Sequence, residues 1–493
     1  MTSTRKAALL AALTLAVTLL AVDGTVLALA MPALTTDLGA SATQVLWIGD
    51  VYSFALAGLL ISMGTLADRI GRRRLLLLGA TGFGAASVLA ALAPSAGWLI
   101  AARVLLGVAG ATLMPSTLSI VRNVFTEPAE RTRAIAIWSA GTAGGAALGP
   151  LIGGALLEHY WWGSVFLINV PVMLLVLAGV ATLVPESRNP SPGRFDPLSA
   201  VLSVAAVVPL VWAVKHTDSA FALVAVVIGG AAGVWFVRRQ RTLRTPLVDI
   251  TLFARPAFAG TVLVSLIAIF AFSGLLFFFS QYLQLVRGYS PLRAGLWELP
   301  ATIASMLVAV VAARVILRLG VGRTLAAALL VTAAGFAVLA VAEGATGYAA
   351  LATALVLIGA GIGITFTAAT DAVLSTVPRE RAGAASAISE MSYELGVALG
   401  IALLGTLQTT LYRAGLPDLS ALSVTTRSAV ADSLAAASQA LAGTGATGSA
   451  ILAAARDAFA HGMQVTSMIA AALLLLSGAI AWKVIPSRPH LDR

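Results

Sequence analysis

Four acidic residues lie inside stretches of sequence that are otherwise long and apolar: Asp23, Asp50, Glu390 and Glu394. A charged side chain held at the centre of a bilayer costs roughly 2.5–3.5 kcal/mol on insertion scales. A carboxylic acid removed from water also exchanges its proton closer to neutral pH than a solvated one does. Four retained acids therefore favour reversible binding of protons and cations over a purely structural role.

Helix geometry predicts that these acids share one depth with a buried cation. At about 1.5 Å of rise per residue, Asp23, Asp50 and Glu394 each fall roughly 20 Å from the inner membrane face. Arg103, in a fourth apolar stretch, falls at the same level, and we expect it to pair with Asp23. Glu390 lies four residues before Glu394 on one helix face, so the two are expected to titrate as a coupled pair. We predict that these five residues carry proton coupling and cation binding.

Aromatic side chains flank the acids in the sequence or open the fifth apolar stretch: Trp47, Tyr52, Trp138 and Tyr393. The face of an aromatic ring attracts organic cations, so these four side chains are predicted to line a substrate site. For the five phenylalanines between residues 270 and 279, ordinary packing is the preferred interpretation.

A stripe of glycines runs along the fifth apolar stretch, with a proline and a further glycine beside it: Gly141, Gly145, Gly149, Pro150, Gly153 and Gly154. Small residues at a spacing of four let two helices pack closely. A proline inside a helix kinks it. The pattern predicts a helix interface that slides or bends.

A charged loop separates the second and third apolar stretches and contains Gly64, Asp68, Arg69, Gly71, Arg72 and Arg73. Asp68 stands at the end of one predicted helix, where its carboxylate can cap the next helix or pair with the loop arginines. We predict that this gating loop latches one conformation of the protein.

The composition places these residues in a membrane protein. The chain has 493 residues, of which 59% are hydrophobic and 11% charged, whereas soluble domains are about 25% charged. Its apolar blocks of roughly 18–30 residues are long enough to cross a bilayer as helices. Because there is no cysteine and the four histidines are widely spaced, we predict no metal site and no cofactor.

Fourteen stretches are apolar enough to span the membrane, approximately 8–31, 44–64, 74–94, 97–118, 133–157, 163–184, 198–214, 220–237, 256–284, 291–313, 323–343, 347–370, 381–411 and 461–486. With the N-terminus in the cytoplasm, 24 of the 31 lysines and arginines fall in cytoplasmic segments and six fall outside. This asymmetry follows the positive-inside rule, so both termini are predicted to be cytoplasmic. The basic charge then reflects orientation and indicates no nucleic-acid partner.

A weak internal repeat suggests two related halves. The run Arg69–Arg74 aligns with Arg318–Arg323 through its arginine, glycine and arginine positions. Two six-helix halves are a plan typical of transporters. We predict an N-terminal half over 1–190, inserted helices 7 and 8 over 191–255, and a C-terminal half over 256–493.

The longest segment outside the predicted spans is 412–460, which we expect on the outer side. Its alanine-rich stretches, about 427–442 and 448–460, could form a helical hairpin over the outer mouth. A flexible loop is the alternative interpretation.

Several of these motifs resemble those of the major facilitator superfamily, in particular its fourteen-helix drug:proton antiporter branch. They are the loop 64–74, the segment Arg103–Gly110, the stripe 145–154, the segment Leu20–Pro32, and the surroundings of Asp50 and Glu390. Within that branch, the whole chain is similar to QacA/LfrA-type quaternary-ammonium efflux pumps. The resemblance implies a proton-driven multidrug efflux antiporter that exports lipophilic organic cations, such as quaternary ammonium compounds, ethidium and biguanides, in exchange for protons.

The resemblance further implies a monomer in the inner or plasma membrane, whose acidic positions serve proton coupling and cation recognition. In one respect the sequence departs from the pattern. Some of these pumps carry another acid on the tenth helix, and residues 301–305 contain none. Large divalent cations are therefore expected to be transported less efficiently.

Three alternatives remain open at the level of the sequence. A protein of the same fold could export one dedicated metabolite or antibiotic. A membrane-embedded enzyme would need a nucleophile and base or a metal cluster at depth; the sequence shows neither, so we expect no enzymatic activity. A passive channel would carry a flux that is insensitive to a protonophore.

Overall fold

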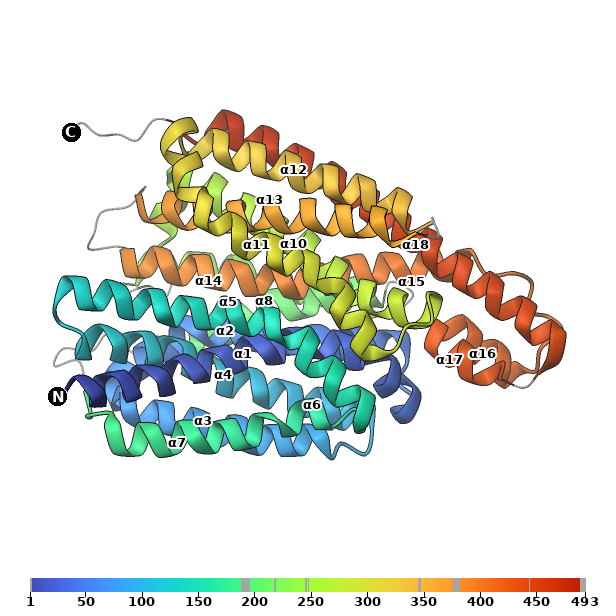
Figure 1. Cartoon of the computed structure of the whole chain (residues 1–493), viewed down its shortest axis with the longest axis horizontal. Coiled ribbons are helices and arrows are strands. Elements are labelled where there is room, and N and C mark those ends of the chain that lie inside the picture. The colour runs from blue at the N-terminus through green and yellow to red at the C-terminus, as the bar shows by residue number, and fades with distance from the viewer. Residues whose placement is uncertain are drawn as a thin grey trace. The chain divides into compact units, whose positions relative to one another are not determined.

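The structure is a computed structural model that describes residues 2–187, 196–216, 219–243, 246, 248–344, 347–375, 382–442 and 444–487. Over these ranges the chain is helical, with no strand (Figure 1). This is the fold class that the composition predicts, because helices satisfy their own backbone hydrogen bonds where lipid offers no partner.

The contacts divide the chain into two compact units. Unit 1 comprises Met1–Ala30 and Val51–Val248, and unit 2 comprises Met31–Asp50 and Asp249–Arg493. The division therefore passes through α1 and α2, which span Ser3–Leu38 and Ala42–Ile70. The three-part organisation proposed from the sequence stays a prediction.

Unit 1 holds the first part of α1, most of α2 and seven further helices among its described residues. These are α3 (Arg72–Ala91), α4 (Ala96–Val124), α5 (Pro128–His159), α6 (Ser164–Leu167), α7 (Asn169–Leu183), α8 (Pro197–Lys215) and α9 (Ala222–Thr242). The helix ends follow local chemistry. The Ser95 hydroxyl, for example, accepts a hydrogen bond from the Trp98 backbone N–H and caps α4.

Unit 2 holds the end of α1, the start of α2 and the remaining described helices. They are η1 (Ile250–Ala254), α10 (Pro256–Gln281), η2 (Tyr282–Val286), α11 (Pro291–Leu319), α12 (Val321–Ala342), α13 (Tyr348–Ser375), α14 (Ala382–Leu399), η4 (Gly400–Leu404), α15 (Gly405–Ala414), α16 (Val424–Asp432), α17 (Leu434–Ala440) and α18 (Gly445–Val484). Two of them, η2 and η4, are π-helical turns that continue α10 and α14. Such turns are rare and are often found at functional sites.

Each of the fourteen predicted spans coincides with a helix or a broken helix. Twelve helices within the described residues are long and apolar enough to cross a membrane, and α5, bent by 40° between Ala146 and Leu148, gives a thirteenth. The remaining predicted span corresponds to α11, which is not among these thirteen. The count of fourteen membrane-spanning helices therefore stays a prediction.

The internal repeat recurs in the backbone of both units. Gly71 and Gly320 have positive φ angles of 112° and 78°, and each precedes a helix. A side chain at either position would be strained, which explains why glycine stands at both. In unit 1, the Arg72 backbone N–H donates to the Ser187 carbonyl oxygen. In unit 2, the Gly322 N–H donates to the Pro486 carbonyl oxygen, so each loop is tied to the segment that follows a later helix of its own unit.

Most described residues of segment 412–460 are helical, with 415–423 as the longest exception, which favours the helical hairpin over the flexible loop. Its predicted place over the outer mouth stays a prediction. It contains the end of α15, all of α16 and α17, and the start of α18 (orange to red in Figure 1). Val430, Ala437 and Leu441 form a small buried core there. The predicted start of the last helix at residue 461 is wrong, because α18 begins at Gly445 and extends into this segment.

An ion pair joins the ends of α8 and α9. The Arg239 guanidinium donates two hydrogen bonds of 3.0 Å to the Asp196 carboxylate. Asp196 also caps α8 by accepting from the Ser199 backbone N–H and hydroxyl. Burial raises the pKa of Asp196, but the hydrogen bonds from Arg239 and Ser199 outweigh it and hold the pKa below its ordinary value of 3.8.

We expect Asp196→Ala to destabilise the protein by roughly 1–2 kcal/mol, because it removes a helix cap and a bidentate ion pair. The pKa of Asp196 is lowered in the folded protein, so its contribution is complete above about pH 4 and is lost as the pH falls through the folded pKa. Thermal unfolding of purified protein checks this: the gap between the variant and wild type should be constant from pH 7 to 5 and shrink below about pH 4. Asp457→Ala, at an exposed position on α18, is the control.

Candidate functional site

The predicted ion pair between Asp23 and Arg103 is present in unit 1. Their side chains meet at 3.0 Å, and only 1% of Asp23 and 2% of Arg103 are exposed. The Asn169 amide donates to the second Asp23 oxygen at 2.9 Å and to the Ser87 hydroxyl at 3.1 Å. The Arg103 guanidinium lies 4.7 Å from the centre of the Tyr52 ring. The site thus holds one carboxylate and one fixed counter-ion, out of contact with water.

Five helices supply this cluster, which explains why parts of it escape sequence reasoning. Asp23 belongs to α1, Arg103 to α4 and Tyr52 to α2, whereas Asn169 begins α7 and Ser87 lies on α3. Asp23 and Arg103 stand out in the sequence because they are charged residues in apolar stretches. Asn169 and Ser87 do not, because a single neutral polar residue in an apolar stretch does not indicate a partner.

The glycine stripe of α5 packs against α1, the helix that carries Asp23. A Cβ atom at Gly145 would overlap the Thr18 carbonyl oxygen, and one at Gly149 would overlap the Thr25 hydroxyl. Gly141 and Gly153 make equally close approaches to α1. Pro150 cannot donate to the carbonyl of Ala146, which is where α5 bends. The close packing predicted from the stripe is therefore confirmed, while sliding along it stays a prediction.

The predicted substrate-lining aromatics are divided between the two units, so their common lining of one substrate site stays a prediction. Tyr52 is 4% exposed and already lies over Arg103. Trp138 is 8% exposed, and its indole N–H donates to the Thr117 hydroxyl at 3.2 Å. Both belong to unit 1. Trp47 and Tyr393 are half-buried and belong to unit 2.

The gating loop is held by Glu186, a residue that the sequence did not single out. The Glu186 carboxylate accepts from the Arg73 backbone N–H at 3.2 Å and lies 3.7 Å from the Arg74 guanidinium. The Arg73 guanidinium donates to the Ala181 carbonyl oxygen at 2.6 Å. The loop is therefore tied to the end of α7. The predicted role of Asp68 concerns a side chain that lies outside the described residues.

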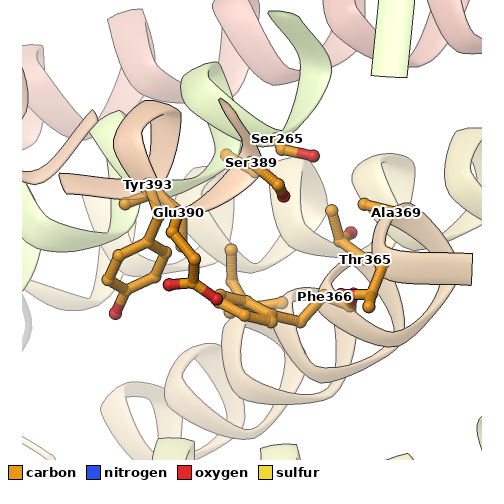
Figure 2. Close-up of a pocket in the computed structure, with 11 residues that line it drawn as sticks. Ser265, Thr365, Phe366, Ala369, Ser389, Glu390 and Tyr393 are labelled. Carbon is orange, nitrogen blue, oxygen red and sulfur yellow. The ribbon is translucent and has the colours of Figure 1, made fainter. Parts of the chain in front are cut away.

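A cavity surrounds Glu390 in unit 2. Figure 2 shows the Glu390 carboxylate between the Tyr393 and Phe366 rings, and Ser265 and Thr365 also line the cavity. Glu390 and Tyr393 come from α14, Phe366 and Thr365 from α13, and Ser265 from α10. The two rings meet edge to face, with centroids 5.2 Å apart. The cavity measures about 40 Å³, room for about one water molecule, so a drug-sized ligand fits only when its walls part.

The other predicted acids also lie in unit 2. Glu394, one helical turn after Glu390, is half-buried on α14. Asp50 is fully buried on α2, and its contacts assign it to unit 2 although most of α2 belongs to unit 1. Gly49 explains this placement, because it lets α2 approach the Phe277 ring and the Ile401 side chain.

Two acids that the sequence did not single out are almost fully buried. Glu298 on α11 is 3% exposed and lies beside Ser280, and its Oε1 has no hydrogen-bond partner among the described residues. Glu343, directly after α12, is 3% exposed and accepts from the Ser467 hydroxyl. Both stand near the ends of predicted spans, where an acid reads as solvent-exposed. Residues 301–305 contain no acid, but α11 carries a buried carboxylate, that of Glu298, about one turn earlier.

We expect Gly145→Ala to destabilise the protein by roughly 1–3 kcal/mol, because the added methyl group must displace the α1 backbone. Gly144→Ala is the matched control, since a Cβ atom there meets nothing within 4 Å. Thermal unfolding of both purified variants tests the difference. Equal unfolding temperatures would contradict the close contact between α1 and α5.

Comparison with known proteins identifies the family to which this chain belongs. The family model described as Major Facilitator Superfamily matches residues 13–401. The multidrug efflux pump LfrA of Mycolicibacterium smegmatis is 45% identical over 97% of this chain and 96% of its own. The methyl viologen resistance protein SmvA of Salmonella typhimurium is 38% identical over 94% of each chain. A bacterial homologue of the human lysosomal transporter Spinster has the same fold, with a TM-score of 0.71 at 20% identity over 98% of this chain and 97% of that one. The chain belongs to the Major Facilitator Superfamily and is a multi-pass membrane transporter rather than an enzyme.

Proposed function

We propose that the protein exports lipophilic organic cations from the cell in exchange for protons, as a multidrug efflux antiporter of the plasma membrane with both termini in the cytoplasm. The observation that carries this proposal is the Glu390 cavity, in which one carboxylate lies between two aromatic rings and apolar walls. The names of the relatives support it, since LfrA is described as a multidrug efflux pump and SmvA as a methyl viologen resistance protein.

The residues that line the cavity suit a lipophilic cation. The Glu390 carboxylate supplies a full negative charge, and none of the described residues that line the cavity is basic. Phe366 and Tyr393 offer ring faces, which attract quaternary ammonium groups by about 0.5–2 kcal/mol each. The remaining wall is built from alanine and isoleucine side chains with threonine and serine hydroxyls. Such a wall binds by shape and apolar contact, which tolerates a range of ligands.

Proton coupling follows from competition for one charge. A desolvated carboxylate is most stable when a positive charge neutralises it, and either a proton or a cation can do so. The two then exclude each other, so arrival of the proton favours release of the drug. Each elementary charge that moves inward through 100 mV supplies about 2.3 kcal/mol, enough to drive export against a gradient.

Asp23 is the acid through which proton binding would change the conformation of unit 1. A proton on its carboxylate would cancel the attraction that holds Arg103 at 3.0 Å. The guanidinium would then need another acceptor, which gives unit 1 two discrete arrangements. The α5 stripe lies against the same helix, α1, so a change at Asp23 has an adjacent interface through which to act.

A second candidate function is export of one dedicated compound by the same fold. Two relatives favour it: the tetracenomycin C resistance and export protein of Streptomyces glaucescens is 36% identical over 83% of this chain, and the puromycin resistance protein pur8 of Streptomyces alboniger is 34% identical over 95%. Transport of a single compound out of a panel of unrelated cations would support this alternative.

Ethidium efflux from loaded cells tests the antiport proposal. We expect wild-type cells to export ethidium until a protonophore is added, and Glu390→Gln to reduce export at least tenfold because the amide can bind neither proton nor cation by charge. Asp23→Asn should also abolish energised export.

The control is Asp418→Asn, an exposed acid in the segment between α15 and α16. All variants are first matched for abundance in the membrane. Export that persists with the protonophore, or that is unchanged in Glu390→Gln, would refute proton-coupled export through this cavity.

A further inference from the structure

Three cavities follow one another in unit 2 along α10 and the consecutive helices α14, η4 and α15. The first surrounds Glu390 and includes Ser265 of α10. The second includes Gly274 of α10 and Leu404 of η4. The third includes Gln281 of α10 and Gln408 of α15. From Ser265 to Gln281, α10 rises about 24 Å, so the row extends from the depth of Glu390 toward the helices of segment 412–460.

The third cavity, which we call the Asp432 pocket, has the same chemistry as the Glu390 cavity. Its wall contains the Asp432 carboxylate, the Tyr412 ring and the Phe278 and Phe459 rings. The Glu390 cavity likewise combines a carboxylate with a tyrosine and a phenylalanine. Both also measure about 40 Å³. Two sites of matching composition on one helical path are expected to select the same class of ligand.

The Asp432 pocket has acceptor capacity that the protein leaves available. Gln408 is 2% exposed, and its Oε1 has no hydrogen-bond partner among the described residues. The Asp432 carboxylate accepts two bonds of 3.2 and 3.1 Å from the Ala42 backbone N–H. Among the described residues, the cation paired with it is Arg413, whose guanidinium is half exposed and lies 3.7 Å away. That distance is long for an ion pair, so a better-placed cation could compete with Arg413.

Two π-helical turns lie beside the middle cavity and the Asp432 pocket. Phe278 lines both the middle cavity and the Asp432 pocket, so its ring separates them. The π-helical turn η4 ends at Leu404 beside the middle cavity, and η2 begins directly after Gln281. Such turns are rare overall but are frequent at functional sites.

We propose that the Asp432 pocket is a second binding site for lipophilic organic cations, which they occupy after leaving the Glu390 cavity and before release outside. This inference rests on the proposed export function. The cation lies against the Asp432 carboxylate in place of Arg413, with its apolar body between Phe459, Tyr412 and Phe278. Segment 412–460 then supplies part of a substrate site, since it provides Asp432 and Phe459.

Ethidium binding to the full-length protein in lipid nanodiscs tests the proposal, with ethidium fluorescence as the readout. We expect two saturation steps for wild type. Asp432→Asn should weaken one step about tenfold, and Phe459→Leu should weaken the same step about two- to fivefold while preserving the bond from Ala42 to Asp432. Arg413→Gln should tighten that step, because it removes the competing cation.

The opposite effects of the Arg413 and Asp432 variants separate a binding site from a folding defect, which would weaken binding in both. Asp418→Asn is the matched control, because this exposed acid of the same segment lies outside the pocket. The proposal is overturned if wild type shows one step only, or if Asp432→Asn and Phe459→Leu both bind as the control does. If Glu390→Gln leaves both steps intact, the proposed export site fails and the Asp432 pocket stands.

Discussion

The buried ion pair between Asp23 and Arg103 is the interaction on which unit 1 depends. Either charge alone would cost several kcal/mol to bury, and removing one partner of such a pair typically costs 3–5 kcal/mol. The pair requires α1 and α4 to meet at one depth, and Asn169 adds α7 by donating to the same carboxylate. Glu390 in unit 2 differs, because the described residues that line its cavity include no fixed cation. Under the proposed function, a proton or a cargo cation supplies its countercharge.

Helix packing in unit 1 also depends on close contact between helices, here through apolar surfaces. Lipid gives helices no hydrophobic reason to associate, so close contact must come from small residues and shape. The α5 glycines supply this contact to the helix that carries Asp23. Both units also tie a glycine-led loop to a distant segment, at Gly71 and at Gly320. The weak internal repeat in the sequence therefore corresponds to the same backbone arrangement in both units.

The sequence predicts the positions of the long helices well, because a helix that crosses a bilayer needs about 20 consecutive apolar residues, and such a stretch is easy to recognise. It also predicts the partner of Arg103, because depth along each helix can be counted. It does not predict Asn169 or Glu186, since their partners lie 146 and 113 residues away and only the fold brings them together. Glu298 was missed for a related reason: nearness to a helix end does not measure burial.

Under the proposed mechanism, the number of exchangeable acids limits the charge of the cargo. One carboxylate neutralises one positive charge, so exchange of a proton for a monovalent cation leaves the Glu390 cavity equally neutral in both states. Neither state is then trapped by the cost of an unpaired buried charge. A divalent cation would bring an excess charge unless a second acid gave up its proton at the same time. Glu394, one turn along α14, is the nearest such group in sequence, and coupling between the two would make divalent transport depend on both.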